Sequence, residues 1–73
     1  MEALIKNIRE RMKKNYMSQK ELALRTGLTE ATISRYLHGT RRMSVKSLYY
    51  IARALGTTID GLMKGVDWSE MYD

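Results

Sequence analysis

The segment between residues 18 and 39 constrains the fold more than any other part of the chain, because it holds two short helical patterns around one glycine. Ser18 and Glu21 are spaced as a capping box, which satisfies backbone N–H groups at the start of a helix. This spacing predicts that a helix begins at Gln19. Gly27 ends that helix, because glycine adopts a positive φ without the steric penalty of a Cβ atom.

A second helix is expected directly after this break. Thr29 can cap it through its hydroxyl group, and the charge of Glu30 suits the positive end of the helix dipole. The apolar residues that then face one another across the turn are Leu22, Ala23, Leu28, Ile33 and Tyr36 or Leu37. The short or polar side chains left on the outside of the second helix are Glu30, Ala31, Thr32, Ser34 and Arg35. This is the pattern of a helix-turn-helix, a motif whose second helix enters the major groove of DNA.

The rest of the chain predicts three further helices. Apolar residues recur at helical spacing in the N-terminal segment and again after Ser44, which can cap a helix, and Thr57 or Thr58 begins a short last helix. The expected helices are Glu2 to Lys14, Gln19 to Thr26, Glu30 to Leu37, the helix that Ser44 caps and that extends to Gly56, and Ile59 to Lys64. Gly39 is expected in a left-handed position after the third helix. Because strand-like alternation is absent, the sequence indicates a compact, all-α, five-helix fold.

The charge is distributed unevenly along the chain. Thirteen Lys and Arg against eight Asp and Glu give a formal net charge of +5. All thirteen basic residues lie in residues 1–64 with five of the acids, which leaves +8 there, whereas residues 65–73 carry three acids and no base. We therefore divide the chain into a basic DNA-binding domain, residues 1–64, and an acidic C-terminal tail, residues 65–73. Charge alone also fits a well-solvated surface, but together with the helix-turn-helix it favours a nucleic-acid partner.

Other classes of function find little support in the composition. With one histidine, no cysteine and no glycine-rich phosphate loop, the sequence predicts no catalytic residue, no metal site, no cofactor and no enzymatic activity. His38 is expected to be a polar residue at a helix end. The absence of Phe and of strand aromatics disfavours RNA as the partner. No apolar run approaches the ~20 residues of a membrane span, and the charged N-terminus is unlike a signal peptide. We expect a cytoplasmic protein that does not bind a membrane.

The sequence resembles the lambda-repressor-like helix-turn-helix family, the Cro and phage-repressor type of transcription regulators. The resemblance covers about residues 4–64, and the residues that carry it are Ser18 to Ala23, Gly27 to Thr29, Ile33 to Tyr36, Gly39, Leu48, Ile51, Ala52, Ala54 to Gly56 and Leu62. Each piece alone is common, but the ordered set at this spacing is specific. The resemblance implies a bacterial or phage-encoded regulator, a repressor by preference, that lies on the nucleoid when bound.

The chemistry of the side chains, read with this resemblance, predicts the DNA contacts. The residues expected to reach base edges are Gln19, Glu30, Ala31, Thr32, Ser34 and Arg35. Arg35 can bond guanine O6 and N7, and Thr32 can offer its methyl group to thymine. Glu30 can accept from a cytosine amine, or it can serve only to stabilise the helix dipole. The residues expected to contact phosphates are Ser18, Thr29, Tyr36, Arg41, Arg42, Lys46 and Ser47.

Selection of one DNA site in a genome is expected to require two subunits. One reading helix covers about four or five base pairs at about 1–3 kcal/mol for each mismatch, which is too little to select one site in a genome. A two-fold dimer on a palindromic operator would double the sequence that is read. Family members of this size often pair through the last helix, which suggests Met63, Val66 and Trp68 as interface residues. Alternatively, the chain is an antitoxin or adaptor of the same fold that grips a protein partner through residues 66–73.

Two positions depart from the family pattern. Many members join the first and third helices by a buried Arg–Glu pair, and the corresponding residues here are Met12 and Leu37. Because an apolar contact can replace a buried ion pair without loss of stability, we expect these two side chains to touch. Met43 stands where a loop proline is common, which leaves the geometry of the Arg41–Arg42 loop open. Of the adjacent Tyr49 and Tyr50, we expect one to pack and one to be partly exposed.

Overall fold

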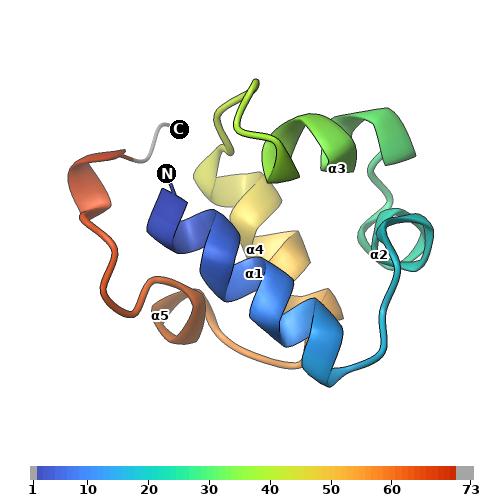
Figure 1. The fold of residues 1–73 in the computed structure, drawn as a ribbon, viewed down its shortest axis with the longest axis horizontal. Coiled ribbons are helices and arrows are strands. Elements are labelled where there is room, and N and C mark those ends of the chain that lie inside the picture. The colour runs from blue at the N-terminus through green and yellow to red at the C-terminus, as the bar shows by residue number, and fades with distance from the viewer. Residues whose placement is uncertain (1, 71–73) are drawn as a thin grey trace.

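Five α-helices and one short 3-10 helix make up residues 2–70, the part of the chain that this computed structural model describes (Figure 1). They are α1 (Glu2–Lys14), α2 (Gln19–Thr26), α3 (Glu30–Leu37), α4 (Val45–Ala54), α5 (Ile59–Leu62) and η1 (Trp68–Glu70). The all-α prediction is confirmed, since no strand occurs within these residues. The first three helices begin and end at the predicted residues.

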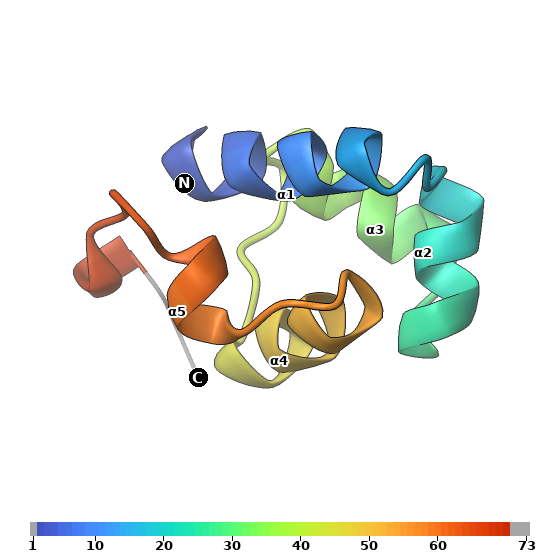
Figure 2. The same ribbon diagram turned by 90° about the horizontal axis from the view of Figure 1, so that it is seen from below.

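The contacts between helices form a closed ring, in the order α1, α3, α2, α4, α5 and back to α1. Figure 2 shows α1 and α3 on one side, α4 on the other, α2 at one end and α5 at the opposite end. The helix-turn-helix, α2 and α3, is therefore held from both sides, because α1 packs against α3 and α4 packs against α2. This arrangement leaves the far side of α3 free to face a partner.

Four hydroxyl side chains begin four of the helices. Each accepts a hydrogen bond from the backbone N–H three residues further on, at 3.0–3.1 Å: Ser18, Thr29, Ser44 and Thr58. Each such cap stabilises the fold by about 1 kcal/mol. Gly27 closes α2 at a φ of 77°, as predicted. The Glu21 carboxylate lies 3.5 Å from Arg25, so this side chain forms an ion pair along α2.

A single apolar core fills the ring. The largest fully buried side chains come from all five helices and from the loop between α3 and α4: Leu4, Ile8, Leu22, Ile33, Met43, Leu48, Ile51 and Leu62. Burial of each contributes about 1.5–3 kcal/mol relative to exposure. Met43, at the position where the resemblance led us to expect a proline, is fully buried and so anchors the loop from inside. The loop is thus held by packing at a position where a proline would restrict the backbone directly.

Side chains of the N-terminal segment (residues 2–15) bond the carboxyl ends of other helices. A guanidinium N–H of Arg9 donates to the carbonyl oxygen of Leu37, at the end of α3, at 2.9 Å. The Asn15 amide donates to the carbonyl oxygen of Leu55, after α4, at 3.0 Å. The last carbonyl groups of a helix have no partner inside the helix. These long-range bonds supply a partner for such carbonyl groups. Local sequence patterns do not predict them.

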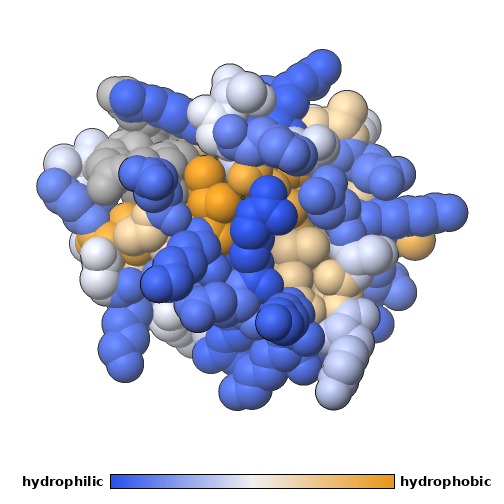
Figure 3. All heavy atoms as spheres, viewed as in Figure 1, coloured by the Kyte–Doolittle hydropathy of each residue, from blue (hydrophilic) through white to orange (hydrophobic). Residues whose placement is uncertain are grey.

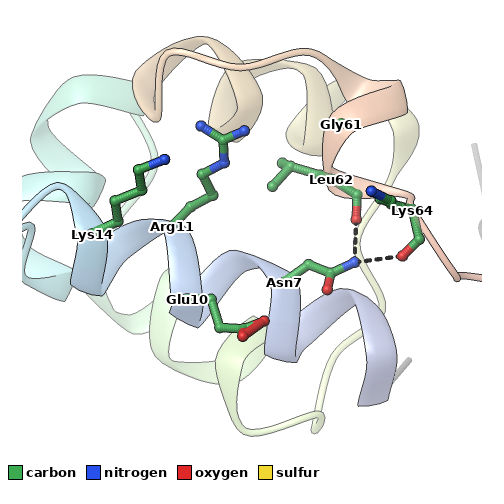
Figure 4. Close-up of a pocket in the computed structure, with 7 residues that line it drawn as sticks. All are labelled: Asn7, Glu10, Arg11, Lys14, Gly61, Leu62 and Lys64. Carbon is green, nitrogen blue, oxygen red and sulfur yellow. Dashed lines mark hydrogen bonds between the residues drawn. The ribbon is translucent and has the colours of Figure 1, made fainter.

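The Asn7 side chain likewise bonds carbonyl groups at the carboxyl end of α5. Its amide nitrogen donates to the carbonyl oxygens of Leu62 at 2.7 Å and Lys64 at 2.9 Å (Figure 4). These bonds hold the chain as it turns out of α5, which ends two residues before the predicted Lys64. α4 also ends early, at Ala54, because Gly56 adopts a φ of 70° that a right-handed helix does not allow.

The C-terminal tail begins inside the fold. Val66 is buried and belongs to the core, so apolar packing continues past residue 64. Trp68 follows in η1 with 51% of its surface exposed. The Asp67 carboxylate accepts a hydrogen bond from the Ser69 N–H, which lowers the pKa of that carboxyl below its usual value. The other apolar residues of the tail, Met71 and Tyr72, lie outside the described residues.

Two expectations about the core have different outcomes. Tyr49 and Tyr50 are 44% and 38% exposed, so the prediction that one of them packs is wrong. The buried stripe of α4 runs through Leu48 and Ile51, and both tyrosines lie outside it. Met12 and Leu37 are buried in the same core cluster. A direct contact between these two side chains stays a prediction.

Candidate nucleic-acid interface

One face of α3 is anchored and the other is open. Ile33, Tyr36 and Leu37 are buried against the core. The α3 outer face consists of the side chains that remain, of which three are exposed and two are half-buried: Glu30, Ala31, Arg35, Thr32 and Ser34. All five are among the residues predicted to reach base edges. The helix therefore presents a polar surface on a fixed backbone, which direct reading of bases requires.

Hydrogen bonds hold the Thr32 side chain in place and bring His38 beside Ser34; Thr32 and Ser34 are the two half-buried residues of this face. The Thr29 hydroxyl caps α3 and also donates to the Thr32 hydroxyl, at 2.9 Å. At the other end, His38 Nδ1 lies 2.7 Å from the Ser34 carbonyl oxygen and 3.3 Å from its hydroxyl. Because a carbonyl only accepts, Nδ1 carries the hydrogen. His38 thus acts as the polar helix-end residue that the sequence predicted.

Two further predicted DNA contacts, Ser18 and Gln19, lie at the start of α2. Gln19 is the first residue of α2 and is half-buried. Ser18 precedes it, exposed, and accepts from the Glu21 N–H. Within residues 2–70, the hydrogen of the Ser18 hydroxyl has no acceptor, so it can be donated to an anion. The Thr29 hydroxyl hydrogen is already used within α3.

The loop between α3 and α4 carries two exposed arginines, Arg41 and Arg42. The Arg41 guanidinium lies over the ring of Tyr36, with its central carbon 5.9 Å from the ring centroid. The loop turns back on α3, because the Thr40 N–H donates to the Arg35 carbonyl at 3.0 Å. A cation near an aromatic face is attracted by the ring quadrupole, so Arg41 has a preferred place even without a partner.

Tyr36 and Ser47 do not lie where the sequence placed them. We expected both to contact phosphates, but they are only 4% and 8% exposed. Their hydroxyl groups bond each other at 3.0 Å inside the fold. This bond joins the end of α3 to the first turn of α4 through side chains alone, and both groups are buried. Lys46, between Ser47 and the cap of α4, is exposed as expected.

The segment that carries these groups is strongly basic. Residues 18–47 contain six Lys and Arg against two Asp and Glu. One of the two acids, Glu21, is paired with Arg25. The other, Glu30, lies in the first turn of α3. A surface of this charge attracts a polyanion at long range and does so less as the salt concentration rises.

Two hollows lie outside this surface. One, between α1 and α5, is lined by Arg11, Lys14 and Lys64 beside Asn7 (Figure 4). The other is a groove between α1 and the end of α3, where charged side chains of both signs surround Ile5 and Leu37. Figure 3 shows the face that carries α1, on which apolar atoms lie among hydrophilic ones. None of the predicted DNA-contacting residues lines either hollow.

The three residues suggested for a dimer interface differ in exposure. Met63 and Val66 are buried in the core of their own subunit. Between them in the chain, the Lys64 carbonyl oxygen accepts a hydrogen bond from the Asn7 side chain of α1. A second subunit cannot reach them without rearrangement, so our expectation for these two is corrected. Trp68 alone of the three is exposed.

Two further kinds of site were sought in the described part of the chain. Across residues 2–70, no group of three or more His, Cys, Asp or Glu side chains is placed to hold a metal ion. Over the same residues, none of the helices has the length and apolar character that crossing a membrane takes.

Comparison with known proteins identifies the family. The model of a helix-turn-helix family matches residues 8–62, which is more than half of the chain. The match begins within α1, includes α2, α3 and α4, and ends with the last residue of α5. A search of the curated proteins found no match. With the capped α2 and α3, the Gly27 turn and the open face of α3, this match shows that the chain belongs to the lambda-repressor-like helix-turn-helix family of DNA-binding regulators.

Proposed function

We propose that this protein is a sequence-specific repressor of transcription that binds a palindromic operator as a dimer and acts on the nucleoid, in the cytoplasm of a bacterium or of a phage-infected cell. The observation that carries the proposal is the α3 outer face, which is polar and open while the rest of α3 is buried. A repressor of this kind acts by covering a promoter. The chain need only hold α3 in the major groove and secure it through the backbone.

The exposure of the α3 side chains supports a set of base contacts. Its amino-terminal half enters the groove, where Glu30 and Ala31 face the bases. Arg35, one turn further on, bonds guanine or a nearby phosphate. The bond from Thr29 orients the Thr32 hydroxyl, which leaves the Thr32 methyl group to contact a thymine. Sequence is read by these side chains, and each good contact discriminates by about 1–3 kcal/mol.

Phosphate contacts come from the elements on both sides of α3. Ser18 has a hydroxyl hydrogen to donate, and Gln19 offers its amide at the start of α2. Arg41, Arg42 and Lys46 are exposed on the other side, in the loop and the first turn of α4. Contacts of this kind fix the position of the protein on the duplex without reading sequence.

Selection of bound duplexes from a random library tests the proposal. We expect a palindrome with half-sites about 34 Å apart, one turn of the double helix. Binding should weaken steeply as salt rises, since each neutralised phosphate releases counterions. A single unrepeated half-site would refute the dimer, and a library that shows no enrichment at low salt would refute sequence-specific binding.

One observation favours the alternative of an antitoxin or adaptor. Trp68 is a large apolar side chain with half of its surface exposed, on an acidic segment at the end of a basic domain. Such a segment suits a protein partner with a basic, apolar groove. Deletion of residues 67–73, which spares the buried Val66, should leave DNA binding intact and abolish capture of the partner. Trp68→Ala is the matched point variant. If both changes weaken operator binding instead, Trp68 belongs to the DNA-bound dimer.

A further inference from the structure

Tyr36 contacts both elements that follow α3 in the chain, the loop between α3 and α4 and the start of α4. It lies in the last turn of α3 and is almost fully buried. Its ring lies beneath the Arg41 guanidinium of the loop, at 5.9 Å. Its hydroxyl group bonds the hydroxyl of Ser47, in the first turn of α4, at 3.0 Å. One side chain of α3 thus reaches both elements that carry basic residues after it.

The bond to Ser47 extends to the start of α4. The Ser44 hydroxyl donates to the Ser47 hydroxyl at 3.1 Å and accepts from the Ser47 N–H at 3.1 Å. Tyr36, Ser47 and Ser44 therefore form a chain of three hydroxyl groups. Lys46 lies between the two serines in sequence, in the turn that this chain holds. Buried hydroxyls must keep their partners, so the turn cannot shift relative to α3 without losing a bond.

We propose that Tyr36 is a positioning residue for DNA binding: it sets Arg41 and Lys46 at fixed places relative to the α3 outer face. This rests on the proposed function, because it concerns how phosphate contacts are aligned with base contacts. A basic side chain that is already in place loses less conformational entropy when it meets a phosphate. Tyr36 touches no DNA itself and acts through these two side chains.

Affinity for DNA and discrimination between DNA sequences should respond differently to a change at Tyr36. Phosphate contacts carry no sequence information, so their misplacement should weaken binding to every duplex by the same factor. The number of phosphates that are neutralised should also fall, and with it the dependence of affinity on salt. Discrimination between operator and other sequences should not change, because the α3 outer face is untouched.

Tyr36→Phe is the test, since it keeps the ring, the packing and the contact with Arg41 and removes only the hydroxyl. We expect binding to the selected operator and to an unrelated duplex to weaken about 3- to 10-fold alike, with the slope of log affinity against log salt reduced by about 1. Ser47→Ala should weaken binding at least as much, because it removes the bond to Tyr36 and also the bond from Ser44. The double variant should be no weaker than Ser47→Ala alone, because that change already removes the bond between Tyr36 and Ser47.

Thr58→Ala is the control, because it removes the hydroxyl cap of α5, which packs against α1 and α4 and has no predicted DNA contact. It should lower the melting temperature and leave affinity and salt slope unchanged. Tyr36→Phe and Ser47→Ala with wild-type affinity and slope, or with effects that simply add, would overturn the positioning role. Failure of the wild-type protein to bind any duplex would overturn the proposed function instead.

Discussion

The helix-turn-helix and the N-terminal segment are stabilised in opposite ways. In α2 and α3, the decisive bonds join residues three or four apart: Ser18 to the Glu21 N–H, Thr29 to the Thr32 N–H, and the Gly27 N–H to the Ala23 carbonyl. In the N-terminal segment, the decisive bonds cross the molecule. Arg9, Asn15 and Asn7 reach carbonyl groups that lie 28, 40 and 55 residues away.

The shape of the helix-turn-helix and its attachment to the rest of the fold therefore depend on different bonds. The local bonds give α2 and α3 their lengths and the sharp turn between them. The long-range bonds set how α3, α4 and α5 are held against α1. Changes in the first set should therefore alter the local geometry and DNA binding, whereas changes in the second set should mainly alter global stability. The following variants test this division.

The largest effect is expected on the discrimination between DNA sequences. Arg35→Ala should reduce discrimination between the operator and a mutated site by about 1–3 kcal/mol, with little change in unfolding, because Arg35 is exposed on the α3 outer face. Arg9→Ala should lower the free energy of unfolding and leave discrimination unchanged, since it removes the bond to the Leu37 carbonyl. Competition binding and urea unfolding measure the two effects.

Arg53→Ala is the control for lost charge, because Arg53 lies beside Tyr49 near the end of α4. It should weaken binding only slightly and keep discrimination. If Arg53→Ala matched Arg35→Ala, the effect of Arg35 would be electrostatic and the reading role would be lost. If Arg9→Ala altered discrimination more than stability, the division between the two regions would fail.

A smaller effect is expected for Asn7→Ala. It removes two hydrogen bonds, each of about 0.5–1.5 kcal/mol, and gains some helix propensity, so the free energy of unfolding should fall by about 1–2 kcal/mol. Asn15→Ala removes one such bond and should cost about half as much. Urea denaturation followed by circular dichroism provides the comparison. Equal and negligible losses would show that α1 holds the other helices by apolar packing alone.

Gly27→Ala tests the turn between α2 and α3, which local interactions determine. A Cβ atom at this position would meet nothing within 4 Å, so the cost comes only from the φ of 77° and should be about 1 kcal/mol. Gly27→Asn should cost less, because asparagine tolerates this conformation. Thermal unfolding measures both variants. A loss with asparagine that equals the loss with alanine would argue against backbone strain as the cause.

The smallest effect should be a gain. Tyr16, just after α1, has a φ of 54° and is 98% exposed, so it carries strain and packs against little. Tyr16→Gly should raise the free energy of unfolding by about 0.5–1 kcal/mol, the relief of strain less the extra entropy of glycine. The melting temperature reports this change. A lower value would mean that the Tyr16 ring packs on the domain in solution.

Sequence patterns predicted the fold and most of the surface residues. The caps, the glycine positions and the bounds of three helices followed from interactions within one turn of chain. The polar face of α3 followed from helical periodicity. The bounds of α4 and α5 were extended too far. α4 ends before the turn at Gly56, and α5 ends at Leu62, where Asn7 bonds the carbonyl oxygens of Leu62 and Lys64. Tyr36, which helical periodicity also offered as a core residue, and Ser47 were placed at the surface because no local pattern predicts that their hydroxyl groups bond each other inside the fold.

The sequence by itself determined the helix-turn-helix, its caps and its basic character, since these depend on side chains and backbone groups that are neighbours along the chain. Only the tertiary structure decided which hydroxyls lie inside, which aromatic side chains stay exposed and how the N-terminal segment bonds the ends of the other helices. Those outcomes depend on the closed ring of helices, which brings together groups that are tens of residues apart.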